Sequence, residues 1–440
     1  ALVAGAFFLA RRLCAHPLAA ALLTLAAPVF ILSSGSVMCD TMMLALWIWA
    51  VICWMEGLAD NRAAKLWLAA ILVSACCLTK YFGIALLPLL LAYSVLERRR
   101  IGTWLVPLCL PVLVLAAYQW LTYLLYGRGL LFNAVHYATH ARVGGGLPLK
   151  IITGLSFTGG SICVLLPLAP WLWNKKNLLA ALMVGAVSTL VCTEAGEFQV
   201  GDRVQLHWLF AVQFTLFVVA GASLLLIAMD DWRAQKTPAS ALLLLWVAGT
   251  YLFAAAVNWT VSGRNILPML PAASILLIRR LERRNWLPPS RLIGPLWMPL
   301  GFSVAVGLLA ARADYQWANS ARNAAAVLRQ KIGTSAPGIW FEGHWGFQYY
   351  LEQQGGKPLN RAHLLVPPNG AIILPWENCY PFPLPRDKVE KWFRYECVGE
   401  KWVTTMNTTA GAGYYSDGWG PLPFAFCHAP LQQYSVLRVK

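Results

Sequence analysis

Long apolar segments separated by short polar loops are the feature that most restricts how this chain can fold. Twelve such segments lie at about 1–10, 18–36, 41–56, 66–79, 81–96, 103–125, 151–173, 177–193, 204–227, 239–257, 265–279 and 294–312. A helix needs about 20 apolar residues to cross a bilayer, so 66–79 and 81–96 are short and are expected to be tilted or partly re-entrant. Only 12% of the residues are charged and 58% are hydrophobic, which excludes an ordinary soluble globule. We therefore predict an all-α polytopic membrane protein.

The basic residues of the loops predict the topology of these segments. A net charge of +16 would indicate nucleic-acid binding in a soluble protein, but here the bases lie in short loops between apolar segments, so no nucleic-acid partner is expected. Loops on one side hold sixteen bases (Arg11, Arg12, Arg62, Lys65, Arg98, Arg99, Arg100, Lys175, Lys176, Arg233, Lys236, Arg279, Arg280, Arg283, Arg284 and Arg291), and those on the other hold seven (Lys80, Arg128, Arg142, Lys150, Arg203, Arg264 and Arg312). The richer side is cytoplasmic by the positive-inside rule, and Asp40 and Lys80 then face outward.

Residues 313–440 are more polar and form a separate domain on the outer side, following a membrane domain at 1–312. Trp317–Ile332 and Gly346–Gln353 have helical spacing, whereas Gly338–Glu342 and Ala371–Leu374 have the pattern of buried strands. A small extracytoplasmic α/β domain is expected. Outside the cytoplasm, one disulfide is expected among Cys379, Cys397 and Cys427, with one thiol left over.

Three charged residues of the predicted outer side are candidates for a functional site. Asp40 opens the segment 41–56, Lys80 lies between two short apolar segments beside Tyr81, and Arg264 begins a late segment. Each also has a simpler interpretation: Asp40 as a helix N-cap, and the two bases as side chains that reach the lipid headgroups. Together, one acid and two bases at the lipid boundary suit a lipid-linked phosphate, with the acid serving the reacting hydroxyl.

Histidines and aromatic residues give weaker candidates. His136 and His140 are four residues apart on a predicted interfacial helix, a spacing that can bind a metal only if a third ligand is supplied. In the C-terminal domain, His344 and Trp345 lie in an aromatic run between a strand and a helix, and the run 414–421 is similarly rich in aromatic residues and glycine. Aromatic faces of this kind contact sugars, but they also form turns and small cores.

The N-terminal part of the chain resembles the GT-C glycosyltransferases. An arginine-rich turn precedes Leu18–Ser36, Asp40 opens the next helix, Trp67–Leu78 leads into Thr79-Lys80-Tyr81, and Ser262–Pro271 opens a late helix. The nearest relatives by this pattern are the dolichyl-phosphate-mannose–protein mannosyltransferase-like group (glycosyltransferase family 39) and the lipid A aminoarabinose transferases. The resemblance covers about residues 1–280, and the C-terminal domain matches only in position.

The resemblance implies an inverting enzyme of a bacterial inner membrane that moves a sugar from a polyprenyl-phosphate donor to an acceptor outside the cytoplasm. Asp40 would match the family's second acidic position and serve catalysis, while Lys80, Tyr81 and Arg264 would bind the donor phosphate. His136, His344 and Trp345 are candidate contacts to acceptor or sugar. Metal dependence varies within the superfamily, so no cofactor is implied as fixed and a divalent metal stays open.

The family's first outer loop carries its main acidic motif, and that loop is absent from this sequence. Ala1 stands directly in an apolar run with no basic residues before it, so we expect a missing N-terminal segment, with the twelve segments as helices two to thirteen. The sequence as given would then be inactive. Two alternatives remain at this point: a transporter of lipids or sugar-lipids, and a catalytically inactive envelope assembly protein.

Overall fold

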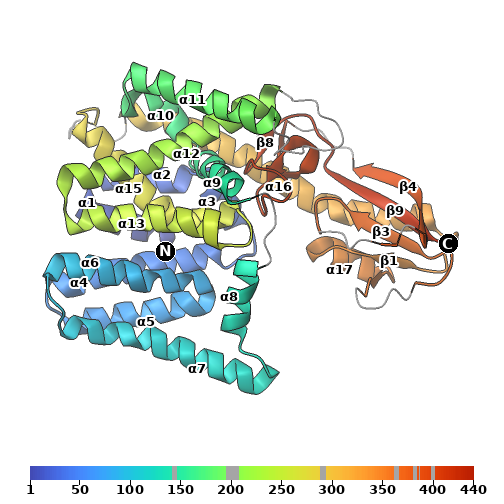
Figure 1. Ribbon diagram of the computed structural model, residues 1–440, viewed down its shortest axis with the longest axis horizontal. Helices are drawn as coiled ribbons and strands as arrows, with labels where there is room; N and C mark the ends of the chain where they lie inside the picture. Colours follow the sequence, from blue (N-terminus) through green and yellow to red (C-terminus); the bar gives the residue numbers. More distant parts are fainter. Residues whose placement is uncertain are drawn as a thin grey trace. The chain divides into compact units, whose positions relative to one another are not determined.

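The computed structural model describes residues 1–140, 146–194, 208–287, 294–360, 366–379, 384–385, 387–397 and 402–440 (Figure 1). The chain divides into two compact units. The helical unit comprises Ala1–Glu197, Ala211–Leu308 and Tyr415–Gly418. The C-terminal unit comprises Phe198–Phe210, Leu309–Tyr414 and Trp419–Lys440. Arg142, Arg203 and Arg291, which contributed to the charge count, lie outside the described residues.

Helices account for nearly all the regular structure of the helical unit. In chain order they are α1 (Leu2–Leu13), α2 (Pro17–Ala26), α3 (Pro28–Gly35), α4 (Asp40–Ala59), α5 (Ala63–Thr79), η1 (Tyr81–Ala85), α6 (Leu86–Arg98), η2 (Thr103–Leu108), α7 (Cys109–Tyr126), α8 (Leu130–His140), α9 (Leu147–Ser161), α10 (Leu165–Leu172), α11 (Lys175–Glu194), α12 (Trp208–Gln235), α13 (Pro238–Leu252), η3 (Phe253–Val257), α14 (Gly263–Ile266), η4 (Leu267–Met269), α15 (Leu270–Arg283), η5 (Gly294–Leu296) and the first part of α16 (Trp297–Ile332). The prediction of an apolar helix bundle is confirmed.

Fewer helices are long enough to cross a membrane than the sequence suggested. Among the described residues, six helices have the length and composition of a span, or up to eight if two bent helix pairs each count as one. The prediction of twelve spans is therefore not supported. Helix α1 has only 12 residues, α2 and α3 are bent by 59° where Pro28 interrupts the run, and α9 and α10 are bent by 94°. Proline removes a backbone donor and clashes with the preceding turn, so an apolar run need not form one straight helix.

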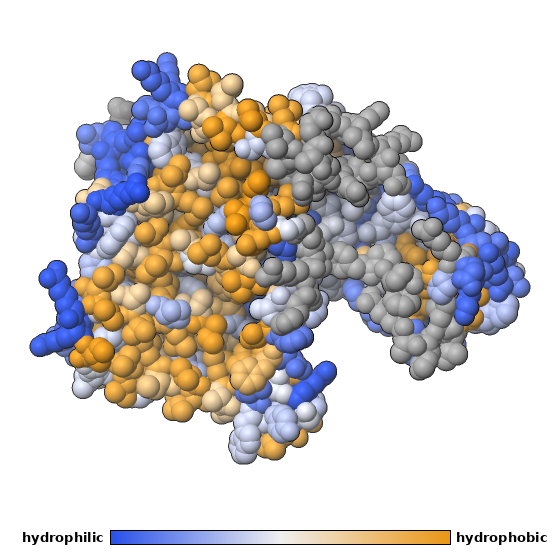
Figure 2. Space-filling view, viewed as in Figure 1, coloured by the Kyte–Doolittle hydropathy of each residue, from blue (hydrophilic) through white to orange (hydrophobic). Residues whose placement is uncertain are grey.

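The surface of the helices agrees with an integral membrane protein. The visible face of α4 to α7 is mostly apolar, and hydrophilic residues gather at the left-hand ends of these helices (Figure 2). Large apolar side chains are exposed along them, including Ile71 of α5 and Leu113 and Trp120 of α7. Such a continuous apolar exterior is unfavourable in water but favourable in lipid.

A mixed sheet organises the C-terminal unit. Its strands are β1 (Ile339–Phe341), β2 (Lys357–Pro358), β3 (Ala371–Pro375), β4 (Val389–Cys397) and β9 (Gln432–Val439), in the spatial order β2-β1-β3-β9-β4. β1 pairs in parallel with β2 and β3, and β9 pairs antiparallel with β3 and β4. Helix α17 (Trp345–Gln353) and the end of α16 supply Leu351 and Leu328 to a core with Phe341 and Val436. Shorter elements are β5 (Val403–Thr404), β6 (Met406–Asn407), η6 (Thr408–Ala410), β7 (Ala412–Gly413) and β8 (Ala425–Phe426).

The expected elements of the C-terminal region are confirmed, but the expected disulfide is not. β1, β3, α17 and the end of α16 lie where the sequence patterns predicted them. Cys379, Cys397 and Cys427 are present as thiols rather than as a disulfide. They lie on separate elements: the Cys379 thiol is 3.6 Å from the Pro375 carbonyl, whereas Cys397 ends β4 opposite Gln432. The disulfide prediction is not borne out, because it rested only on the compartment expected for this region and an oxidising compartment does not bring two cysteines together.

One buried carboxyl group makes the C-terminal unit sensitive to pH. The Glu377 side chain is fully buried and accepts hydrogen bonds from the Thr408 hydroxyl (3.1 Å) and the Gln433 backbone N–H (3.4 Å). Burial raises the pKa of Glu377 from 4.5 to about 7, and the two hydrogen bonds oppose this rise only in part. The folded unit thus holds a proton on Glu377 at pH values where the unfolded chain has lost it.

Glu377→Gln is expected to remove a pH-dependent part of the unit's stability. Because the folded pKa is raised, the stabilisation from the proton is complete below the unfolded pKa of 4.5 and is lost as pH rises through about 7. This shift corresponds to about 3 kcal/mol, and the neutral glutamine does not lose it. The measurement is thermal unfolding of wild type and variant between pH 5 and pH 8. If the two pH curves ran parallel, Glu377 would not be the group responsible.

Candidate functional site

Asp40, Lys80 and Arg264 meet in the helical unit, and we call these three residues the charge cluster. Lys80 Nζ lies 2.6 Å from Asp40 Oδ1, and Arg264 Nε lies 2.8 Å from Asp40 Oδ2. The Asp40 side chain is 0% exposed, whereas those of Lys80 and Arg264 are 23% and 26% exposed. The site therefore consists of one buried carboxylate and two partly exposed cations. The formal net charge of the three side chains is positive.

The structure does not support the interpretation of Asp40 as a helix N-cap. Helix α4 has Cys39 as its N-cap and no side-chain capping bond, and Asp40 follows as the first helical residue. Both carboxylate oxygens accept from basic side chains instead. Lys80 and Arg264 accordingly point at Asp40. A carboxylate in the first turn is also favoured by the helix dipole, which adds to the two ion pairs.

A tight break between α5 and α6 places Lys80. Helix α5 ends at Thr79, Lys80 has an extended backbone, and its carbonyl accepts from the Gly83 N–H at 2.8 Å. A β-carbon on Gly83 would lie 2.7 Å from the backbone of Cys76 and Cys77, so only glycine allows η1 to lie this close to α5. The glycine thus sets the geometry in which Lys80 reaches across to α4.

The loop before Arg264 is held at several points. Lys150 on α9 is 4% exposed, and its Nζ donates to the Trp259 carbonyl at 2.6 Å. The side-chain amide of Asn258 donates to the Thr260 carbonyl at 2.8 Å, and that of Asn265 donates to the same oxygen at 3.2 Å. Helix α14 has only four residues, so these bonds rather than the helix itself fix the position of Arg264.

The segment Tyr415–Gly418, distant in sequence, also contacts this loop within the helical unit. Asp417 Oδ1 accepts from the Thr260 hydroxyl at 2.5 Å and from the Val261 N–H at 3.1 Å, and the Asp417 N–H donates to the Val261 carbonyl at 2.9 Å. Burial raises the pKa of Asp417, while the Thr260 bond and the charge of Lys150 oppose the rise. The aromatic and glycine content of 414–421 is apparent from the sequence, but the contact of Asp417 is not, since no spacing connects it to Thr260.

Asp417→Ala is expected to loosen the loop that carries Arg264. If Arg264 binds substrate, KM should rise about 10-fold with a smaller change in kcat, because the loop loses two acceptor contacts worth about 1–1.5 kcal/mol together. Asp417→Asn keeps an oxygen for the Val261 N–H and should recover most of the loss. Asp387→Ala, an exposed acid, is the control. A fall in kcat alone, with KM unchanged in Asp417→Ala, would contradict this positioning role.

Aromatic side chains pack beside the charge cluster. Trp47 of α4 stacks on Phe82 of η1 with ring centroids 5.4 Å apart, and Phe82 lies 4.6 Å from Phe253 of η3. Trp246 of α13 is 5.7 Å from Trp47 and donates its N–H to the Pro268 carbonyl. These rings join the helices that supply Asp40, Lys80 and Arg264, so they restrict relative movement of the three charges.

The other predicted site residues do not join the charge cluster. The hydroxyl of Tyr81 pairs with that of Tyr118 of α7 at 2.8 Å, although Tyr81 follows Lys80 directly. His136 is exposed on α8, where the next residue, Tyr137, packs against Trp259 with ring centroids 5.5 Å apart. His344 and Trp345 belong to the C-terminal unit, where Trp345 has its ring 51% exposed. Among the described residues, no group of three histidine, cysteine or acidic side chains could hold a metal ion.

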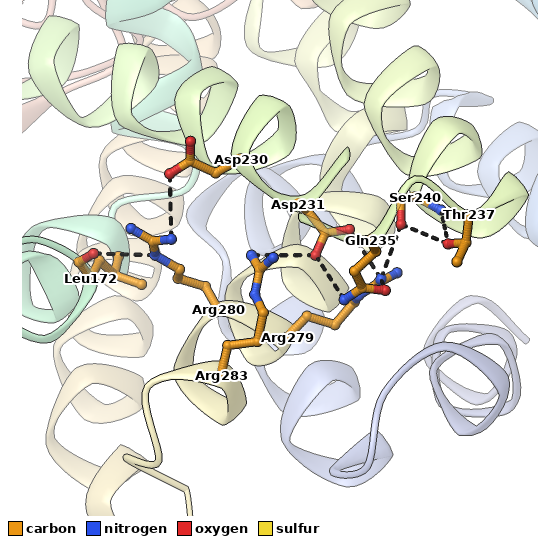
Figure 3. Close-up of polar contacts among 9 residues, drawn as sticks. All are labelled: Leu172, Asp230, Asp231, Gln235, Thr237, Ser240, Arg279, Arg280 and Arg283. Carbon is orange, nitrogen blue, oxygen red and sulfur yellow. Dashed lines mark hydrogen bonds and ion pairs between the residues drawn. The ribbon is translucent and has the colours of Figure 1, made fainter. Parts of the chain in front are cut away.

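A second charged group lies at the far end of α15, about four helical turns from Arg264. Asp231 of α12 is fully buried, 3.1 Å from Arg279 Nη2 and 3.3 Å from Arg283 Nη2 (Figure 3). Arg279 also donates to the Gln235 side chain and, at 3.2 Å, to the Ser240 hydroxyl. Arg280 pairs with Asp230 at 3.3 Å on the more exposed side (Figure 3). These ion pairs connect α12 and α15, and we interpret their role as structural.

One comparison with known proteins, a match to a family model, agrees with the resemblance drawn from sequence. Residues 1–133 match the sequence model of the family described as dolichyl-phosphate-mannose-protein mannosyltransferase, which confirms the resemblance for the part containing Asp40 and Lys80. Crystal structures of ArnT from Cupriavidus metallidurans, bound to undecaprenyl phosphate and apo, are each 16% identical and align over 84% of this chain and 76% of theirs. Their TM-scores are 0.39 and 0.38. A comparison with curated protein sequences finds no match.

Proposed function

We propose that this protein is a membrane glycosyltransferase that transfers a sugar from a polyprenyl-phosphate donor to an acceptor outside the cytoplasm. The observation that carries the proposal is the unused hydrogen-bonding capacity of the charge cluster. Lys80 uses one of its three N–H donors on Asp40, and Arg264 uses only Nε among the described contacts. The remaining donors belong to partly exposed cations, which suits them to the oxygens of a phosphate. The family match over residues 1–133 supports the same substrate class.

The proposed reaction needs cations more than it needs an additional acid at this position. The acceptor oxygen forms a bond to the anomeric carbon from the face opposite the phosphate, the bond from that carbon to the phosphate oxygen breaks, and the configuration inverts. Negative charge grows on the departing polyprenyl phosphate, and donors fixed at that point lower the barrier. Lys80 and Arg264 supply those donors. The acceptor's proton passes to a base other than Asp40, since the Asp40 side chain is fully buried and paired with two cations, out of reach of an acceptor hydroxyl.

Asp40 then acts as a positioning residue. Two cations side by side repel each other, and the buried carboxylate between them compensates this repulsion and fixes the direction of both side chains. The sequence analysis assigned Asp40 to catalysis through the acceptor. Complete burial and two basic partners favour the positioning role instead. We further propose a bacterial inner membrane as the location, with the charge cluster and the C-terminal unit on its outer side.

Lys80→Ala and Arg264→Ala test the proposal directly. The full-length protein is purified in detergent and supplied with radiolabelled polyprenyl-phosphate sugars and a membrane extract as acceptor source. Each variant is expected to lower transfer by about 10²-fold, in the range found for removal of one donor to a developing charge. Lys175→Ala, an exposed base of α11, is the control and should keep wild-type transfer. Wild-type transfer in both site variants would overturn the proposal, as would lipid transport without transfer in proteoliposomes.

A further inference from the structure

The helical unit contains a basic pocket at the end of α4 that is distant from the charge cluster. Its volume is about 500 Å³, and its walls come from the end of α4, the start of α5, the end of α6 and η2. The residues that determine its chemistry are Asn61, Trp67, Arg98, Arg100, Trp104 and Val106. We propose that this pocket binds the headgroup of an anionic phospholipid.

The positive charge of the pocket favours binding of an anion. Arg98 is held in place, because its guanidinium donates to the Leu58 carbonyl and to the Asn61 side chain. Arg100 is exposed, and within the described residues its guanidinium makes no hydrogen bond or ion pair. No acidic side chain lines the pocket. The fixed guanidinium of Arg98 and the exposed guanidinium of Arg100 together present several N–H donors to a phosphate.

The walls of the pocket favour a lipid over a free anion. Trp104 is nearly buried and donates its ring N–H to the Arg100 carbonyl at 3.3 Å, whereas Trp67 and Val106 are 43% and 55% exposed. From Trp67 the apolar exterior continues along α5 to Ile71, one helical turn further. Acyl chains can therefore follow the helix surface while the headgroup stays at the arginines. Tryptophan at this level is typical of the membrane–water interface.

The position of the pocket separates it from the proposed donor site. Asp40 is the first residue of α4, and Gly57, which lines the pocket, is in its last turn. Seventeen residues of helix span about 26 Å, close to the hydrocarbon thickness of a bilayer. The two ends of one membrane-spanning helix face opposite leaflets. The lipid at Arg100 thus comes from the leaflet opposite to the one that supplies the polyprenyl donor.

Native mass spectrometry with dioleoyl phosphatidylglycerol tests this inference on the full chain in detergent. We expect wild type to retain one tightly bound phosphatidylglycerol, and Arg100→Asn to weaken that binding at least 10-fold. Arg99→Asn is the matched control: it removes the neighbouring base, which does not line the pocket, and asparagine tolerates the left-handed backbone found there. This control should change the affinity less than 2-fold.

Other outcomes would overturn the inference. Equal retention of phosphatidylcholine would show that the arginines do not select the headgroup. Competition by glycerol 3-phosphate at the same concentration as the lipid would identify a site for a free phosphate instead. Loss of binding to the same degree in Arg99→Asn and Arg100→Asn, which each remove one positive charge, would indicate diffuse attraction by the basic loop. Trp67→Ala should weaken phosphatidylglycerol binding without creating binding of glycerol 3-phosphate. Unchanged lipid affinity in this variant would contradict the proposed contact between Trp67 and the acyl chains.

Discussion

Asp40→Asn is expected to lower sugar transfer at least 10²-fold while leaving most of the protein folded. The amide keeps the shape of the side chain but removes the charge that compensates Lys80 and Arg264, which lie 2.6 and 2.8 Å from its oxygens. The two cations then repel each other and lose their fixed orientation toward a phosphate. Both are about one-quarter exposed, so water can solvate them after the change, and the loss of stability should be moderate. Initial rates of transfer and the thermal midpoint measure the two effects.

A double variant separates positioning from direct participation. If Asp40 acts only through Lys80 and Arg264, then Asp40→Asn combined with Lys80→Ala should cost clearly less than the sum of the two single losses, because residues that act as a unit are not additive. Fully additive losses would instead indicate that Asp40 contacts substrate by itself. Transfer at the wild-type rate in Asp40→Asn would reduce the carboxylate to a structural ion pair.

The sequence was sufficient to predict the charge cluster because each of its members breaks a strong local pattern. Charges are rare in this chain, so Asp40, Lys80 and Arg264 are conspicuous where apolar segments begin or end. The positive-inside rule then assigned all three to one side, which made a meeting possible without any knowledge of helix packing. What the pattern could not provide was the hydrogen-bonding arrangement. Each oxygen of Asp40 accepts a hydrogen bond from a basic side chain. These two contacts are the reason for proposing a positioning role instead of a catalytic one.

Features that depend on packing were outside the reach of sequence patterns. Asp417 contacts Thr260 across more than 150 residues, and neither residue interrupts an apolar run. The twelve predicted spans were not confirmed among the described residues, because apolar composition does not distinguish a straight helix from one broken at Pro28. In the C-terminal unit, β4 consists mostly of exposed and half-buried residues and was not predicted, whereas the apolar β1 and β3 were predicted.

The buried ion pairs between α12 and α15 lead to the largest expected effect on stability. Asp231 is fully buried and forms ion pairs with Arg279 and Arg283 (Figure 3). The Arg279 side chain is only 6% exposed. Among the described residues, Asp231→Ala leaves the Arg279 guanidinium with the neutral Gln235 and Ser240 side chains as its hydrogen-bond partners. Loss of one partner from a buried pair costs about 3–5 kcal/mol, because the remaining charge stays desolvated. A marked fall in thermal midpoint is therefore expected.

The adjacent residue offers a matched control for this stability prediction. Asp230 is 39% exposed and pairs with Arg280 alone at 3.3 Å, so Asp230→Ala should cost less than about 1 kcal/mol, as for other exposed pairs. Replacing Asp231 and Arg279 together with leucine removes both charges and should recover part of the loss seen in Asp231→Ala. The measurement is the thermal midpoint of the detergent-solubilised protein for all three variants. Equal shifts for Asp230→Ala and Asp231→Ala would show that burial does not set the cost, and the buried pairs would then not be what holds α12 against α15.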